Sequence, residues 1–255
     1  FLIGCFNGAF FPGDILVLYA IVGVILPLVC KWSDKAVLIT AVLLMLQPVE
    51  WAKFLYAMNN PDYVAAPGQW LVHHRNMYPF LGQTDFWAMV KSNLWDGQLF
   101  SLLWGWGHGR FFQTASLFLI GMLIGRRQFF VDLSGHRKFW LRTLLISAVC
   151  FIPLYYFTEA LPGLFTNKSM LSPLNTIFSS FRNFAFMCVL VAVFVFLWQQ
   201  VSGHKVLHGL VPYGKMSLTN YLSQSIIGSF IYFGYGLSLY SELGVAASFG
   251  VGIVL

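Results

Sequence analysis

The sequence predicts an all-α protein, a polytopic transmembrane helical bundle of about seven or eight spans. Three observations lead to this fold class. Of the 255 residues, 58% are hydrophobic and only 9% are charged, whereas an ordinary soluble domain is about a quarter charged. The mean hydropathy is +0.72, so bilayer lipid is the expected solvent. The apolar residues also fall into runs long enough for membrane helices, with many Trp and Gly among them, as is common in such helices and at their interfaces.

Both ends of the chain are apolar. It begins with FLIGCFNGAF and ends with ASFGVGIVL. The first stretch has neither a Met nor a basic region ahead of its apolar residues, so it does not read as a signal peptide. We therefore expect a single integral membrane domain over residues 1–255 that is a fragment, truncated within the membrane at both ends.

The apolar runs place the expected spans along the chain. An interface turn at 10–14 comes first, in which Asp14 caps the following helix. Pro27 is expected to kink the end of that helix. In chain order, the expected spans and partial spans cover residues 1–10, 15–30, 41–56, 111–125, 144–157, 177–198, 213–229 and a final run from Leu243.

A long aromatic connection separates two of these spans. Residues 58–109 are interrupted by several prolines and glycines, which argue against one continuous helix. Within the connection, Phe86, Val90 and Leu94 follow one another at roughly helical spacing. This stripe predicts an interfacial helix that lies flat on the membrane.

The basic residues predict the orientation. Of the 15 Lys and Arg, nine fall in loops of one side: Lys31, Lys35, Arg126, Arg127, Arg137, Lys138, Arg142, Lys205 and Lys215. The other six are Lys53, Arg75, Lys91, Arg110, Lys168 and Arg182. Short loops rich in Lys and Arg stay in the cytoplasm, so the first side is cytoplasmic and the 58–109 loop is extracytoplasmic. The expected location is the bacterial cytoplasmic (inner) membrane, with multiple passes.

Several classes of site are not supported by the pattern. The positive charges follow topology instead of forming a patch, so no nucleic acid partner is expected. The four cysteines lie in or beside apolar runs without C-x-x-C spacing, which favours small apolar fillers. His73 and His74 are placed in a loop without acidic neighbours at ligand spacing, so no metal site is expected.

One stretch combines a membrane-like context with many polar side chains. In YGKMSLTNYLSQSIIGS, residues 213–229, helical spacing puts Ser217, Asn220, Tyr221 and Gln224 on one face. Such groups can act as interhelical glue through hydrogen bonds across helices. They can also line a polar cavity that binds a hydrophilic substrate. We expect the second, because a polar stripe over two turns exceeds what glue requires.

Four further residues are candidates for the same cavity, each with a plainer alternative. Arg182 lies in the outer part of a span and is either a snorkelling anchor or an anion binder. Asp14 is either an N-cap or a carboxylate at the mouth of the cavity, paired with Arg110 or Arg182. His108 and Arg110 follow glycines at the outer mouth. His108 is the candidate for a catalytic base, and its alternative is a solvated loop histidine.

Three blocks of the sequence resemble a known family. YGKMSLTNYLSQSII resembles the signature "GrmaLTNYLlQS" of the YeiB-like integral membrane protein family, also called domain of unknown function 418. GDILVLYAIVG resembles its "GDIL..YA..G" block, and RFFQTASLFLIGMLIGRRQFF resembles its "LiGmllGr.g.f" helix. Members usually carry a His shortly before "GDIL", where this chain has Asn7. The "RG.al.Gi" and "GP.E..WR" segments of the family are absent.

The resemblance implies a class of function. The family is distantly similar, in its helix pattern, to transmembrane acyltransferases. This similarity implies a multi-pass protein with a polar intramembrane cavity that transfers acyl groups to a cell-envelope saccharide or lipid. No bound cofactor is expected; the donor would be acyl-CoA or a similar thioester, and membrane lipids the other partners. The alternatives are a transporter or exporter of a small polar solute and a non-catalytic membrane scaffold.

Overall fold

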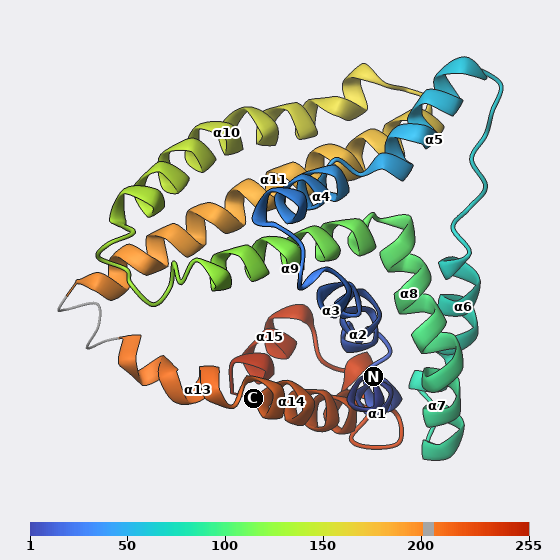
Figure 1. The fold of residues 1–255 in the computed structure, drawn as a ribbon. Coiled ribbons are helices and arrows are strands. Elements are labelled where there is room, and N and C mark those ends of the chain that lie inside the picture. Colours follow the sequence, from blue (N-terminus) through green and yellow to red (C-terminus); the bar gives the residue numbers. More distant parts are fainter. Residues whose placement is uncertain (201–206, 255) are drawn as a thin grey trace. The chain divides into compact units, whose positions relative to one another are not determined.

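A computed structural model describes residues 1–200 and 207–254, so Lys205 lies outside the described range. The described residues form helices and no strand (Figure 1), which confirms the predicted all-α class. The chain divides into two compact units. Unit 1 comprises residues 1–21, 67–107 and 210–255, and unit 2 comprises residues 22–66 and 108–209.

Three helical segments are long and apolar enough to cross a membrane, judged by length and composition among the described residues. They cover Asp34–Asn59, Arg137–Leu164 and Lys168–Gln199, and Leu16–Val29 is a shorter apolar segment. The expected spans at 41–56, 144–157 and 177–198 fall within the three long segments. The larger number of seven or eight spans stays a prediction.

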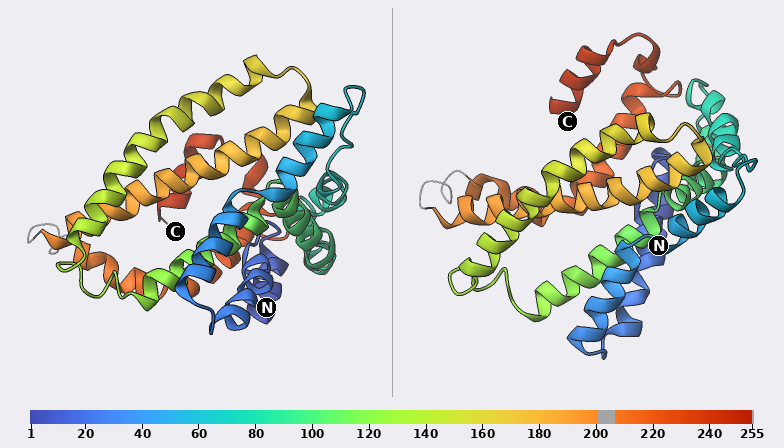
Figure 2. Two further views of the ribbon diagram at one scale, coloured as in Figure 1. Left: turned by 45° about the horizontal axis from the view of Figure 1, so that its top comes forward. Right: turned by 90° about the horizontal axis from the view of Figure 1, so that it is seen from above.

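Unit 2 contains these three segments. Its helices are α3 (Ile25–Val29), α4 (Asp34–Met45), α5 (Pro48–Asn59), α9 (Arg110–Arg126), α10 (Arg137–Leu164) and α11 (Lys168–Gln199). The two longest, α10 and α11, run side by side in every view (Figures 1 and 2). Helix α4 packs on α9, and α5 packs on α11.

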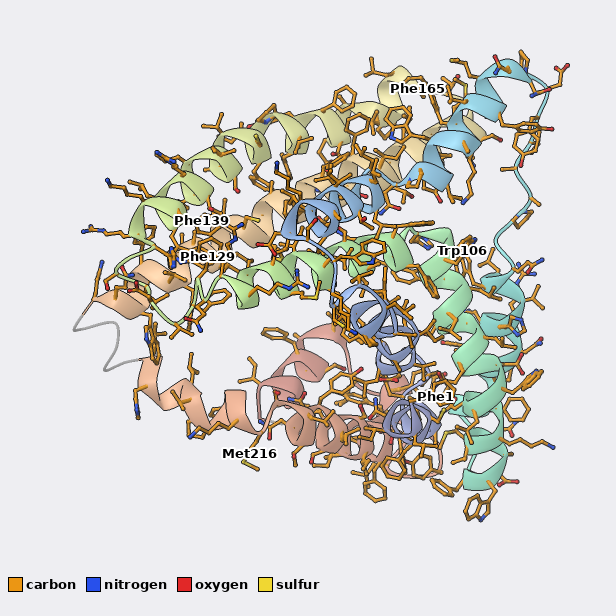
Figure 3. The ribbon with its side chains drawn as sticks, in the orientation of Figure 1. Phe1, Trp106, Phe129, Phe139, Phe165 and Met216 are labelled. Atoms are coloured by element: carbon orange, nitrogen blue, oxygen red, sulfur yellow. The ribbon has the colours of Figure 1, made fainter. Side chains whose placement is uncertain are left out.

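The core of unit 2 is built from small and branched side chains. One cluster joins Val29, Val37, Ala41 and Leu119, and a second joins Trp140, Ala192 and Val195. At the turn before α10, the rings of Phe129 and Phe139 stack with centroids 4.1 Å apart (Figure 3). Most other large apolar side chains of α10 are exposed, as are Phe186, Leu190, Val193, Phe194 and Leu197 of α11. Such an exterior suits contact with lipid better than contact with water.

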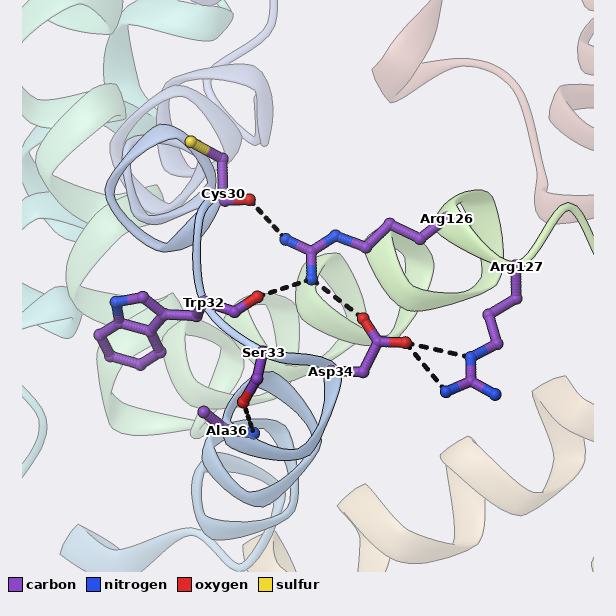
Figure 4. Close-up of polar contacts among 7 residues, drawn as sticks. All are labelled: Cys30, Trp32, Ser33, Asp34, Ala36, Arg126 and Arg127. Atoms are coloured by element: carbon purple, nitrogen blue, oxygen red, sulfur yellow. Dashed lines mark hydrogen bonds and ion pairs between the residues drawn. The ribbon is translucent and has the colours of Figure 1, made fainter.

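Two adjacent arginines tie the start of α4 to the end of α9. Arg126 donates to the carbonyl oxygens of Cys30 and Trp32 and to Asp34 (Figure 4). Arg127 donates twice to the other carboxylate oxygen of Asp34, at 3.1 and 2.9 Å. Arginine suits this place because its fork of donors satisfies the carbonyls that remain free at a helix end.

Unit 1 is assembled from shorter helices. They are α1 (Leu2–Phe10), most of α2 (Leu16–Gly23), α6 (Trp70–Leu81), α7 (Phe86–Ser92), the π-helix η1 (Asn93–Gly97), α8 (Gln98–Gly107), α13 (Val211–Lys215), α14 (Ser217–Tyr232), the 3-10 helix η3 (Leu239–Ser241) and α15 (Val245–Val254). A further 3-10 turn, η2 (His208–Leu210), precedes α13. The expected helix in the long connection is present as α7, η1 and α8, which follow one another without a break.

Proline shapes two of the apolar segments. The first is interrupted at Val24, between α2 and α3, where Pro27 removes a helical hydrogen bond and crowds the preceding turn. The second is interrupted at Gln47, just before Pro48 begins α5. The span expected at 41–56 is therefore built from parts of two helices, because the residue before a proline is disfavoured in the right-handed helical conformation.

Candidate functional site

Asp14 lies at the centre of a buried polar group in unit 1. It is 1% exposed. Its Oδ1 accepts hydrogen bonds from Nδ2 of Asn7 at 2.8 Å and from the hydroxyl of Tyr221 at 3.0 Å. Its Oδ2 accepts the backbone N–H of Leu16 at 3.1 Å, which is the hydrogen bond of a helix N-cap. Asp14 thus caps α2, as the sequence predicts, and also joins α1 to α14.

The side chains on the polar face of α14 lie in two different environments. Tyr221 is half-buried and bonded to Asp14. Asn220 is also half-buried, while Ser217 and Gln224 are exposed. The side chains of these last three residues make no hydrogen bond to any described part of the chain. Interhelical glue requires such bonds, so their absence is an argument against the glue alternative for these three residues. Their role in lining a cavity stays a prediction.

A second polar group occupies the interruption between α4 and α5 in unit 2. Gln47 is fully buried and adopts a left-handed backbone conformation, with φ of 56°. Its Nε2 donates to the carbonyl oxygen of Gly109 at 2.9 Å and to Oγ of Ser180 at 3.1 Å. Its Oε1 is buried without a hydrogen-bond partner. A non-glycine residue with positive φ is strained, so these bonds hold the chain in a costly conformation.

This interruption lies at the middle of a candidate span. Gln47 is flanked by 13 residues back to Asp34 and 12 on to Asn59. At about 1.5 Å per helical residue, it is roughly 20 Å from either end. A buried polar side chain at such depth is a functional-site candidate by default. Helices broken near the midplane form the binding sites of many transporters.

The arginine and histidine candidates belong to the surroundings of Gln47. His108 and Arg110 flank Gly109, and Arg110 donates to Oε1 of Gln113 at 2.8 Å. Gln113, in turn, donates to the carbonyl oxygen of Ser180 at 3.4 Å. Arg182 forms a 3.4 Å ion pair with Glu159 on α10. Arg110 and Arg182 therefore have partners within unit 2, whereas Asp14 and the α14 residues belong to unit 1.

One candidate pair of side chains was missed by sequence reasoning. His73 lies in helix α6, not in a loop, and its Nδ1 is 2.8 Å from Oδ1 of Asp96 in η1. Asn76, one turn along α6, donates to the same oxygen at 3.2 Å. The side chains of His73 and Asp96 are partly exposed, at 22% and 19%. His73 and Asp96 are 23 positions apart, so there was no local signal, although π-helices frequently mark functional sites.

Other sites fit the described residues less well. No group of three or more His, Cys, Asp and Glu side chains is close enough to hold a metal ion in the described part of the chain, and the four cysteines are free. Unit 2 has an open groove of about 620 Å³ lined by Leu26, Pro27, Cys30, Leu117, Phe118, Gly121 and Met122. Its walls are almost wholly apolar, which suits hydrocarbon better than a polar solute.

Long apolar helices with polar side chains buried among them define a helical membrane protein. The chain belongs to the family described as "Protein of unknown function (DUF418)", whose model matches residues 124–255. It is similar to "Uncharacterized protein YxaH" of Bacillus subtilis (strain 168), with 27% identity over 249 residues. The match covers 92% of this chain and 57% of that protein, so the chain spans little more than half of its relative's length. No solved structure matches.

Proposed function

We propose that the protein is a membrane-bound acyltransferase that esterifies a hydroxyl group of a cell-envelope saccharide or lipid. The observation that carries the proposal is the 2.8 Å contact between His73 Nδ1 and Asp96 Oδ1. A histidine oriented by a carboxylate is the recurring base of acyl transfer to and from hydroxyl groups. This pair takes the role of base for which the sequence offered His108.

The tautomer follows from the partner. A carboxylate accepts hydrogen bonds, so Nδ1 of His73 carries the proton and Nε2 of the neutral ring keeps a lone pair. Nε2 removes the proton from the acceptor hydroxyl while the oxygen of that hydroxyl attacks the carbonyl carbon of the thioester donor. The carbon–sulfur bond then breaks, and the imidazolium returns its proton to the departing thiolate. The products are an ester and a free thiol, with the base regenerated.

The donor and acceptor follow from chemistry and topology. Acyl-CoA or a similar thioester supplies an activated acyl group, and no bound cofactor is needed. The 58–109 loop that carries His73 faces outward in a multi-pass inner-membrane protein, so the acceptor belongs to the cell envelope. Asn220, Gln224 and Ser217, in the same unit as His73, offer amide and hydroxyl groups suited to the hydroxyls of a saccharide.

Transfer of a radioactive acyl group tests the proposal. The full-length protein, reconstituted in lipid vesicles with labelled acetyl- or succinyl-CoA and an envelope saccharide fraction, should move the label to the saccharide or lipid. The label should be released by mild alkali, as an ester is. If vesicles that contain the protein show no label in any acceptor fraction, the result would contradict acyl transfer to the envelope.

Asn220→Ala is expected to separate substrate binding from folding. The Asn220 side chain has no hydrogen-bond partner in the described part of the chain, so its loss should change the melting temperature in detergent by little. If it binds the acceptor, acyl transfer should be abolished. Ser225→Ala is a matched control, because the Ser225 hydroxyl is bonded within α14 to the carbonyl oxygen of Tyr221. Equal activity of Asn220→Ala and the wild type would contradict the assigned role.

A transporter of a small polar solute is the second candidate, and the interruption at Gln47 favours it. A helix broken at mid-span with a buried amide is typical of transporter binding sites. Vesicles loaded with labelled solute distinguish the two functions, since transport moves the solute without changing it. The acyltransferase ranks first because the His73–Asp96 pair has a direct role in acyl transfer.

A further inference from the structure

Three consecutive residues of α1 lie inside a ring of polar side chains in unit 1. Asn7 donates to Asp14. Gly8 faces the Gln98 amide so closely that a Cβ built on Gly8 would overlap it. Ala9 accepts, through its carbonyl oxygen, a 2.9 Å hydrogen bond from Nδ2 of Asn93. The end of α1 therefore holds Asp14, Gln98 and Asn93 around one short stretch of backbone.

Most of the unsatisfied atoms in this ring are oxygens. Asn7 and Asn93 are 0% exposed and Gln98 is 9% exposed. Oδ1 of Asn7, Oδ1 of Asn93 and both amide atoms of Gln98 are buried without a hydrogen-bond partner. Each such atom costs about 1–3 kcal/mol unless something satisfies it. Three of these four atoms are amide oxygens of residues around the end of α1, and amide oxygens are ligands that a hard cation prefers.

The charge of the ring is uncompensated. Asp14 forms no ion pair in the described part of the chain, and its three hydrogen bonds come from neutral donors. A carboxylate has about four lone-pair positions, so one remains, on Oδ2. A buried carboxylate without a positive partner is expensive in a low-dielectric interior. A bound cation would remove that cost.

We propose that Asp14, Asn7, Gln98 and Asn93 form a binding site for a sodium ion. A single positive charge neutralises the single carboxylate, whereas a divalent ion would leave a net positive charge buried. The Gln98 amide is packed closely against Gly8, and close packing of the proposed ligands favours Na⁺ over the larger K⁺. The ion would join α1, η1, α8 and the start of α2, so the site is independent of the acyl-transfer chemistry.

Melting of the full-length protein in detergent tests the site, with NaCl, KCl and choline chloride compared at equal ionic strength. Na⁺ should raise the melting temperature saturably, by about 5–10 °C once its concentration is on the order of a hundredfold above the dissociation constant. K⁺ should act less and choline not at all. Equal melting in NaCl and choline chloride would overturn the proposal, as would equal melting in NaCl and KCl.

Variants separate the ion from general packing. Asp14→Asn should abolish the response to Na⁺, but it also weakens the cap of α2 and should lower the stability for that reason alone. Gln98→Met avoids this difficulty, because the Gln98 amide makes no hydrogen bond that the variant would lose. It should melt at least as high as the wild type in choline chloride and respond to Na⁺ at a concentration at least about tenfold higher.

Gln83→Met, at an exposed position of the same unit, is the control and should keep the wild-type response. An unchanged response in Gln98→Met would remove Gln98 from the site and overturn the proposed ligand set.

Discussion

Replacing His73 by alanine is expected to lower the rate of acyl transfer by about 100- to 10,000-fold, the usual contribution of a positioned general base. The melting temperature should fall little, because the His73 side chain and its partner Asp96 are both partly exposed. Added imidazole should restore part of the rate, since it can enter the vacated space and remove the proton. A histidine with a purely structural role would not be replaced in this way.

The neighbouring histidine provides the matched control. His74 also lies on α6, but its ring packs on Tyr78 and Phe100, with centroids 5.7 and 5.3 Å away. His74→Ala should cost some stability and leave the rate per folded molecule unchanged. A loss of rate in His74→Ala equal to that in His73→Ala would contradict the assignment, as would a His73→Ala variant of full activity.

Asp96 is a positioning residue in this mechanism, because it acts through His73. Asp96→Asn keeps the size of the side chain but can present an amide N–H to Nδ1, which would favour the tautomer with its proton on Nε2. The rate should therefore fall, and imidazole should not restore it while His73 still occupies the site. Asn76→Ala, which removes only the second hydrogen bond to Asp96, should have a smaller effect.

The parts of the fold that sequence could predict depend on local or compositional signals. A low charge content and long apolar runs require helices in lipid, whatever their arrangement. The cap at Asp14 was predictable because an N-cap needs only an acceptor just before an apolar helix. The interruption at Gln47 also had a local signal, the following Pro48. The prediction of a span over 41–56 depended on the apolar run on both sides of Gln47 and did not use that signal.

The candidate site depends on contacts between distant segments, which sequence does not reveal without further information. Asp96 reaches His73 because η1 packs against α6, and the hydrogen bond from Tyr221 joins residues 207 positions apart in the chain. Tyr221 and Asp14 were both selected as candidates, on the separate grounds of a polar helical face and a charged residue in a membrane context. Arg110 and Arg182 were selected on the same charge argument, and they lie in the other unit.

The interruption between α4 and α5 depends on a close contact between Gln47 and Gly109. Gly109 has a φ of +66° and caps α9, and its carbonyl oxygen accepts the Gln47 amide. A Cβ at Gly109 would lie 2.6 Å from Oε1 of Gln47 and 2.8 Å from Cγ2 of Thr176. The Gln47 side chain cannot easily withdraw, because it is fully buried and bonded to two acceptors. Only glycine therefore combines this backbone conformation with this approach.

Gly109→Ala is accordingly expected to destabilise the protein by about 2–5 kcal/mol, the sum of about 1–2 for the left-handed conformation and about 1–3 for the overlap. Thermal melting in detergent measures the loss. Gly121→Ala on the same helix is the control, since a Cβ there meets no atom within 4 Å; it should be neutral or stabilising by up to about 1 kcal/mol. In Gln47→Ala the overlapping oxygen is gone, so adding Gly109→Ala to it should cost less than in the wild type. Additive losses would mean that Gln47 and Gly109 act independently, and wild-type melting of Gly109→Ala would mean that the interruption does not depend on this contact.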